Sequence, residues 1–140
     1  MICNFEEVYK NGQTQQGFFL LKDKKLRYEY TNYDLYKIFF VNEKIFVIEN
    51  KNPSKFQELS TDGSVIPIIF DIYKDYPNFK KNYHKNGYKI LVEKNNNKFI
   101  KRISIQSNRV NVSIYFIDCV LEEINEKYFQ IRPLSKYVRN

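Results

Sequence analysis

The chain contains few residues whose type and spacing suggest chemistry. Its one histidine, His84, lies in the polar segment NYHKNG. A histidine-based metal site needs further His or Cys ligands at suitable spacing, and none is near His84 in the sequence. A single histidine in such a segment is usually solvated, so we expect His84 to be exposed in a loop and to bind no metal.

The two cysteines, Cys3 and Cys119, fit neither a metal-ligand spacing nor a redox CxxC motif. They could form a disulfide in a protein that lives outside the cytoplasm. They could equally remain as two buried thiols. No motif gives either cysteine a histidine partner, so the signature of a nucleophilic cysteine is missing.

The acidic residues include two adjacent pairs, Glu6-Glu7 and Glu122-Glu123. Neighbouring residues on a strand point to opposite faces, so we expect neither pair to act as cooperating carboxylates. The four glycines are isolated turn residues and form no phosphate-binding loop. The sequence therefore predicts a protein that is not an enzyme and needs no cofactor.

The composition predicts a folded, sheet-rich single domain over residues 1–140. The chain is 43% hydrophobic and 17% aromatic, with 12 Tyr and 12 Phe. A disordered chain would not carry that aromatic load. Strong strand formers are abundant, whereas small helix formers are scarce, and this balance favours strands over helices.

The formal net charge of +7 admits an anionic partner, either nucleic acid or a membrane surface. The lysines are dispersed, however, and the densest cluster, Lys80, Lys81, Lys85 and Lys89, lies in one polar region. No RNA-binding signature accompanies it. We therefore expect solvated lysines and no nucleic acid partner.

No apolar run approaches the roughly 20 residues that a membrane-spanning helix needs. The first residues, MICNFEEVYK, lack the basic and apolar regions of a signal peptide. We expect either a cytoplasmic protein or a sequence that begins after a cleaved or missing segment.

Hydrophobic alternation and turn residues predict nine or ten antiparallel strands in meander order and one short helix. The expected strands are 4–10, 17–22, 25–30, 34–41, 44–49, 55–59, 87–94, 98–106, 109–118 and 128–131. The helix is expected over 64–76, with Ser64 as its cap and Pro67 near its start.

Such a sheet must curl to bury its apolar face, and its interior is filled either by side chains or by a ligand. In the hairpin GFFLLKDKKLRYEY, Leu26, Tyr28 and Tyr30 share one face while Arg27 and Glu29 share the other. The candidate residues of an apolar cavity are Phe19, Leu21, Leu26, Tyr28, Phe39, Phe46, Ile66, Ile69, Phe70, Ile103, Ile105, Ile114 and Phe116.

The order of these segments resembles that of the LolA-type lipoprotein carriers of the bacterial periplasm. The family's G-x-F-x-L-K strand is matched from Gly17 to Lys22, and its F-R-W-E-Y strand by Leu26 to Tyr30. Its proline-containing short helix is resembled by Val65 to Phe70, and its F-x-I-x-P ending by Phe129, Ile131 and Pro133. The resemblance extends over almost the whole chain, although each motif is loose.

The resemblance implies an open, incomplete antiparallel barrel with one or two short helices over its concave face. It also implies a monomeric periplasmic carrier that binds the acyl chains of lipoproteins. Its implied partners are an inner-membrane lipoprotein-releasing transporter and an outer-membrane acceptor.

Two features depart from the family pattern. The family's Arg-Pro turn is replaced by the shorter Asp23-Lys24-Lys25, and its first helix has no counterpart in this sequence. Two alternatives remain beside the carrier: a basic sheet that stacks nucleic acid bases on exposed aromatic residues, and a structural domain whose core is filled by its own side chains.

Overall fold

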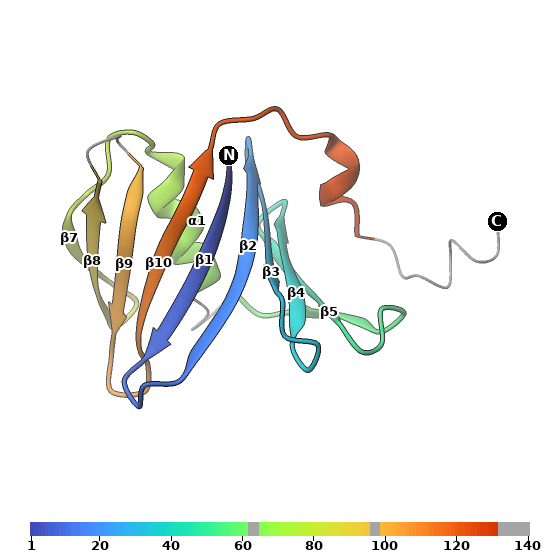
Figure 1. Ribbon diagram of the computed structural model, residues 1–140, viewed down its shortest axis with the longest axis horizontal. Coiled ribbons are helices and arrows are strands. Elements are labelled where there is room, and N and C mark those ends of the chain that lie inside the picture. Colours follow the sequence, from blue (N-terminus) through green and yellow to red (C-terminus); the bar gives the residue numbers. More distant parts are fainter. Residues whose placement is uncertain (62–64, 96–98, 132–140) are drawn as a thin grey trace.

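The computed structural model describes residues 1–61, 65–95 and 99–131. These residues form one antiparallel sheet of ten strands with an α-helix and a short 3-10 helix (Figure 1). The strands are β1 (Ile2–Tyr9), β2 (Thr14–Lys22), β3 (Lys25–Tyr30), β4 (Tyr36–Val41), β5 (Lys44–Glu49), β6 (Phe56–Leu59), β7 (Asn82–Lys85), β8 (Tyr88–Lys94), β9 (Ile100–Gln106) and β10 (Asn111–Val120).

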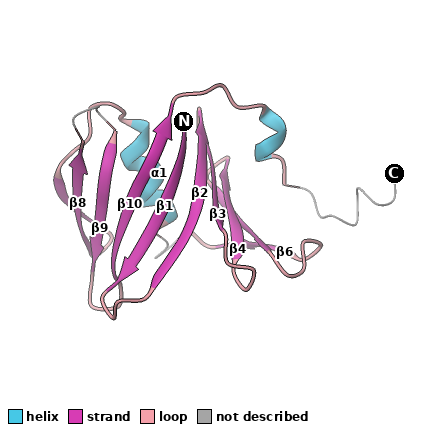
Figure 2. Ribbon diagram, in the orientation of Figure 1, coloured by secondary structure: helices cyan, strands magenta, loops and turns pink. Residues whose placement is uncertain are grey.

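The strand order across the sheet is β6-β5-β4-β3-β2-β1-β10-β9-β8-β7. The first and last long strands, β1 and β10, pair at the centre, and β6 and β7 are the two edges. The sheet is therefore mainly a meander that does not close on itself, and it curves (Figure 2). This confirms the predicted β class and the predicted antiparallel order.

Residues that tolerate positive φ form the tight turns of the hairpins. Asn42 and Glu43 join β4 to β5 with φ of 53° and 63°, and Asn86 and Gly87 join β7 to β8 with φ of 53° and 82°. Two consecutive positive φ values suit a two-residue hairpin turn that follows the twist of the strands. The sequence also predicts turns at 61–63 and 95–97, and these lie partly outside the described residues.

The prediction of a loop around His84 was wrong. Asn82–Lys85 is the edge strand β7, and His84 is an exposed residue opposite Lys89 of β8. The sequence does contain a hairpin pattern here, because Asn-Gly between two strand-like runs is the strongest short-range indication of a hairpin. The segment before it was predicted as a loop because an edge strand with one face in solvent has a polar composition.

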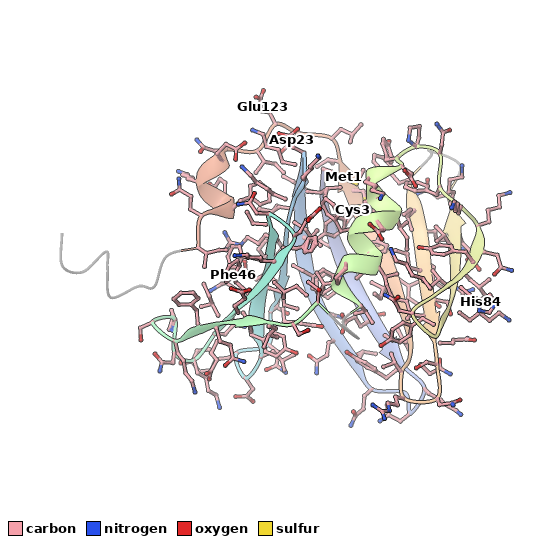
Figure 3. All side chains as sticks on the ribbon, turned by 180° about the vertical axis from the view of Figure 1, so that it is seen from behind. Met1, Cys3, Asp23, Phe46, His84 and Glu123 are labelled. Carbon is pink, nitrogen blue, oxygen red and sulfur yellow. A yellow bond between two sulfur atoms is a disulfide. The ribbon has the colours of Figure 1, made fainter. Side chains whose placement is uncertain are left out.

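The helix α1 (Ile66–Lys74) lies against the concave side of the sheet (Figure 3). It begins after Val65 with Pro67 in its first turn, a position where the missing N–H costs no helical hydrogen bond. The predicted cap, Ser64, lies outside the described residues. The buried side chains of the helix are Ile66, Ile68, Ile69, Ile72 and Tyr73, so α1 supplies a large part of the core.

The convex side of the sheet carries a second, smaller apolar cluster. Leu20, Ile124 and Phe129 are buried there, with Ile2 and Phe18 packed against them. The chain after β10 crosses this face and forms the 3-10 helix η1 (Glu126–Phe129). The prediction of a last strand over 128–131 was wrong, because this segment covers a face of the sheet and pairs with no described strand.

Basic side chains of the β2–β3 hairpin hold this C-terminal segment. The Lys22 ammonium donates to the carbonyl of Ile124 at 2.7 Å, Lys25 pairs with Glu126, and Arg27 donates to the carbonyl of Tyr128 at 3.0 Å. Arg27 also pairs with Glu29 at 2.8 Å, as predicted for their shared face.

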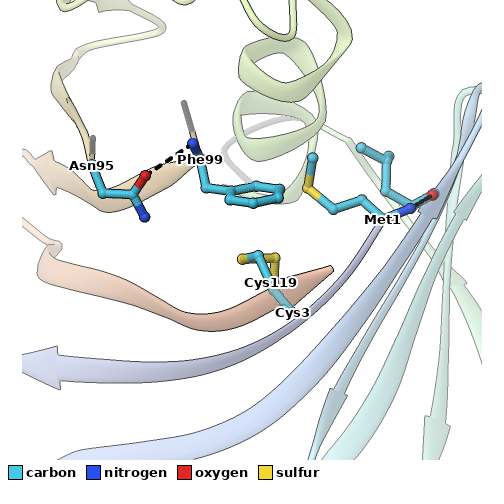
Figure 4. Close-up of a disulfide and its surroundings, with 6 residues drawn as sticks. Met1, Cys3, Asn95, Phe99 and Cys119 are labelled. Carbon is cyan, nitrogen blue, oxygen red and sulfur yellow. Dashed lines mark hydrogen bonds between the residues drawn. A yellow bond between two sulfur atoms is a disulfide. The ribbon is translucent and has the colours of Figure 1, made fainter. Parts of the chain in front are cut away.

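The two cysteines form a disulfide between β1 and β10, with their Cα atoms 4.1 Å apart. The register of the two strands shifts between Ile2 and Asn4, so that Asp118 and Cys119 together oppose Cys3. Such a bulge places an extra residue in one strand and redirects its side chains. The disulfide lies at the core, with Met1 and Phe99 beside it (Figure 4).

Gly17 of β2 permits an unusually close approach between neighbouring strands. A Cβ atom there would lie 2.0 Å from the Glu29 carbonyl oxygen and 2.6 Å from the Phe5 ring. The Phe5 ring stacks on Tyr28, with centroids 4.0 Å apart, and meets Tyr30 edge to face at 5.6 Å. The missing side chain therefore makes room for an aromatic cluster.

We expect Gly17→Ala to destabilise the protein by about 3 kcal/mol or more, since backbone and a packed ring must both move. Gly87→Ala is the matched control, because it has open space but a φ of 82°, and it should cost only ~1–2 kcal/mol. Urea unfolding followed by circular dichroism measures both. Equal losses in the two variants would contradict the role of Gly17.

Candidate functional site: an apolar cleft beside a buried carboxylate

Most of the predicted cavity residues meet in the interior. Nine of them belong to one core cluster and are at most 6% exposed: Phe19, Leu26, Tyr28, Ile66, Ile69, Ile103, Ile105, Ile114 and Phe116. They pack against one another and against α1; the rings of Phe19, Tyr73 and Phe116 lie 5.1–5.5 Å apart. This part of the concave side is therefore filled by the protein's own side chains.

The other four predicted residues occupy different surroundings. Leu21 and Phe70 are half-buried at the margin of the same core, with Phe70 against Phe40 at 5.0 Å. Phe39 and Phe46 lie opposite each other in the β4–β5 pair, whereas their neighbours Phe40 and Ile45 share the core face with Leu26.

Phe39 and Phe46 therefore face the convex side, and the structure does not bring them to the predicted cavity. Arg27 covers the Phe39 ring, with its guanidinium carbon 5.3 Å from the ring centroid. Strand alternation sets this outcome, since in KIFFV only one of the two adjacent phenylalanines can face inward.

A cleft remains open where α1 begins, against strands β3 to β6. Its volume is about 420 Å³, within the range of small-molecule sites, roughly 300–1,000 Å³. Its apolar lining includes Ile38, Ile45, Val47, Leu59 and Ile66. Of the predicted cavity residues, Ile66 alone belongs to this lining.

A buried carboxylate, Glu7 of β1, also belongs to the lining of this cleft. Glu7 is 4% exposed, and three tyrosine hydroxyls donate hydrogen bonds to it. Tyr28 donates to Oε2 at 2.6 Å, Tyr30 reaches both oxygens at 2.8 and 3.1 Å, and Tyr9 donates to Oε1. A carboxylate is an acceptor-only group, so three hydroxyl donors suit it well.

Burial and the Glu7 charge act together on these tyrosines. Desolvation is the main cause that raises the pKa of Tyr9, Tyr28 and Tyr30 above the ordinary value of 10.0, and the nearby Glu7 carboxylate raises each pKa further. The pKa of Tyr36 is raised by the same two causes. All four hydroxyls are therefore protonated at neutral pH and can serve as donors.

The rim of the cleft carries a second carboxylate. Glu49 pairs with Lys55 at 3.0 Å, and both side chains are substantially exposed. Tyr30 and Tyr36 stand edge to face beside Glu7, with centroids 5.5 Å apart. The site therefore combines an apolar channel with a carboxylate and aromatic rings at one end, an arrangement that can bind a ligand.

Glu7 was not among the predicted site residues, although strand alternation points to it. Adjacent Glu6 and Glu7 do face opposite sides, as predicted, but Glu7 shares the face of Phe5 and so must be inward. Tyr28 and Tyr30 were predicted to share one face of β3 with Leu26. The meander order predicted that β1, β2 and β3 are neighbours, but the sequence did not give the register, in which Gly17 lies between Phe5 and Tyr30.

The described residues contain no cluster of three or more His, Cys, Asp or Glu side chains that could hold a metal ion. Within the same residues, no helix has the length and apolar character required to cross a membrane.

We expect Glu7→Gln to destabilise the protein by about 1–3 kcal/mol, because an NH₂ group replaces an oxygen that accepts from buried hydroxyls. Glu6→Gln is the control, since Glu6 makes only an exposed hydrogen bond with Gln16 at 3.0 Å, and its effect should stay within ~0.5 kcal/mol. Chemical denaturation measures both. A loss at Glu6 as large as that at Glu7 would show that the tyrosine network is not what stabilises Glu7.

The raised tyrosine pKa values predict a loss of stability in alkali. The unfolded chain releases the tyrosine protons near pH 10 whereas the folded chain retains them, so their contribution is complete below about pH 10 and is lost as the pH rises above it. The free energy of unfolding should fall above that pH, and less steeply in a Tyr28→Phe/Tyr30→Phe variant. Tyrosinate absorbance that appears at these residues without unfolding would contradict this.

Comparison with known proteins does not assign the chain to a family. No protein-family model matches the chain, and a search of curated proteins finds no significant match.

Proposed function

We propose that this protein is a carrier of acyl chains, of the LolA type, which holds the acyl chain of a lipoprotein in the cleft between α1 and strands β4 to β6. The observation that carries this proposal is the apolar cleft of about 420 Å³ that remains open beside a curved, unclosed sheet. On this view the sheet is an incomplete barrel and α1 is the short helix on its concave side.

The binding energy would come from apolar burial. Each acyl CH₂ group removed from water contributes about 0.8 kcal/mol, and Ile38, Ile45, Val47 and Leu59 supply the apolar contact surface. Leu59 is 41% exposed on the edge strand β6. A bound acyl chain would bury this exposed leucine side chain, as expected at a binding site.

The proposed binding surface differs from that expected from the sequence. The central concave side is filled by α1, so the acyl chain would lie nearer the β6 edge, where Ile66 is the one predicted cavity residue that lines the cleft. Phe19, Ile103 and Ile114 are buried in the core, so in this proposal they contribute to the stability of the fold.

The disulfide supports a compartment outside the cytoplasm. Disulfides persist in oxidising environments such as the bacterial periplasm and are rare in the cytosol, and Cys3–Cys119 joins the central strands. We therefore propose a periplasmic location, with acylated lipoproteins as cargo. An inner-membrane transporter that loads the carrier and an outer-membrane acceptor that unloads it complete the proposal.

The test is displacement of the uncharged fluorescent probe N-phenylnaphthylamine from the purified protein by monodecanoyl glycerol, an uncharged acyl chain. We expect binding that Leu59→Glu weakens by about fivefold or more, because a charge in the cleft loses its hydration when the chain binds. Leu121→Glu is the matched control, since Leu121 is 63% exposed and lies outside the cleft.

Folded protein that takes up neither probe nor acyl chain would overturn the carrier proposal and favour a structural domain with a filled core. Oligonucleotide binding that weakens steeply with salt would instead favour the nucleic acid alternative.

A further inference from the structure

Glu7 has no positively charged partner among the described residues. Its recorded partners are the hydroxyls of Tyr9, Tyr28 and Tyr30, which are neutral donors. Buried charges in proteins are normally paired with an opposite charge or with a metal. A carboxylate offers about four lone-pair directions, and the four hydrogen bonds from these three hydroxyls use them. Because all the donors are neutral, the carboxylate is satisfied as an acceptor but has no opposite charge beside it.

The charge of the cleft opposes that of the whole chain. The protein has a net charge of +7, yet within the described part of the chain the charged residues that line this cleft are Glu7, Glu49 and Lys55. Lys55 and Glu49 pair with each other at the exposed rim, which leaves the Glu7 charge unbalanced at the inner end. A basic protein thus presents a locally acidic site.

Aromatic rings stand beside that charge. Tyr30 and Tyr36 both line the cleft and lie edge to face, with centroids 5.5 Å apart. The faces of aromatic rings attract ammonium groups, and the attraction grows where water is excluded. The same rings offer no donor for an anionic group except their hydroxyls, and the Tyr30 hydroxyl is already used by Glu7.

We propose that the cleft takes an apolar chain that carries a protonated amine, with the ammonium group beside Glu7 and the rings of Tyr30 and Tyr36. This inference rests on the proposed function, because it assigns the polar end of the ligand in the same cleft. For a lipid-modified polypeptide the matching group is a free α-amino group next to the acyl chains. An anionic headgroup would face the Glu7 carboxylate, and the one cation among the described lining residues, Lys55, is paired with Glu49.

The test compares decylammonium, decanoate and monodecanoyl glycerol, which share a chain length and differ in charge, as competitors of N-phenylnaphthylamine. We expect decylammonium to bind about tenfold more tightly than either of the others, a factor that corresponds to one close ion pair in a partly desolvated site. In Glu7→Gln this preference should disappear while the uncharged chain still binds. Circular dichroism confirms that the variant is folded.

Tyr36→Leu gives a second readout that leaves Glu7 intact. Tyr36 is only 36% exposed and lines the cleft, whereas Tyr33 is 65% exposed and does not. Loss of a ring face should reduce decylammonium affinity about two- to fivefold, and Tyr33→Leu should not change it. The uncharged chain should be affected little by either substitution.

The possible results separate the inference from the proposed function. Equal affinity for all three chains, or tighter binding of decanoate, would overturn the inference and leave the acyl-chain carrier intact. Failure of every chain to displace the probe would overturn both. A preference for the amine that persists in Glu7→Gln would also overturn the assignment of the ammonium group to Glu7.

Discussion

The close approach of β1, β2 and β3 at Gly17 is the constraint on which the site depends. Without a side chain at Gly17, the Phe5 ring lies across β2 and stacks on Tyr28. Tyr28 and Tyr30 thereby stand beside the next inward residue of β1, which is Glu7, and their hydroxyls reach its carboxylate. The absence of a Cβ atom at Gly17 therefore influences both the packing at the centre of the sheet and the arrangement of groups at the polar end of the cleft. A buried carboxylate is stable only when its oxygens are satisfied, so the aromatic cluster and the charge depend on each other.

The short helix divides the concave side into two parts with different roles. Over the strands β8, β9 and β10 and the centre of the sheet, α1 supplies the isoleucines and the tyrosine that fill the core. The helix begins near β6 and does not cover the sheet beyond that point. The apolar residues of β4 and β5 therefore line a cleft there. The packed core and the proposed binding cleft therefore occupy different stretches of the same face. This division explains how a protein can have a well-packed interior and still retain an apolar site.

The β2–β3 hairpin holds the C-terminal segment on the convex side of the sheet. The turn Asp23-Lys24 is flanked by Lys22 and Lys25, and these two lysines, with Arg27, bind the segment after β10. The contacts bury Leu20, Ile124 and Phe129 and cover part of a face that would otherwise be apolar and exposed. The hairpin therefore contributes to two surfaces: Phe19, Tyr28 and Tyr30 face the core, while Phe18 and the basic side chains face the C-terminal segment.

The sequence by itself determined the β class, the order of most strands, the helix after residue 64 and the inward face of most strands, because period-2 alternation and turn residues are local properties. Nine of the thirteen predicted cavity residues lie in the core cluster. The prediction of Phe39 in place of Phe40 was wrong, because a fully apolar run does not show which of two adjacent side chains is inward, and a disulfide and two thiols stayed open because they depend on which strands pair. The tertiary structure decided those points, together with the filled centre, the open cleft and the buried Glu7. Each arises from side chains brought together by strands and a helix that are distant in sequence, and no local pattern encodes that pairing.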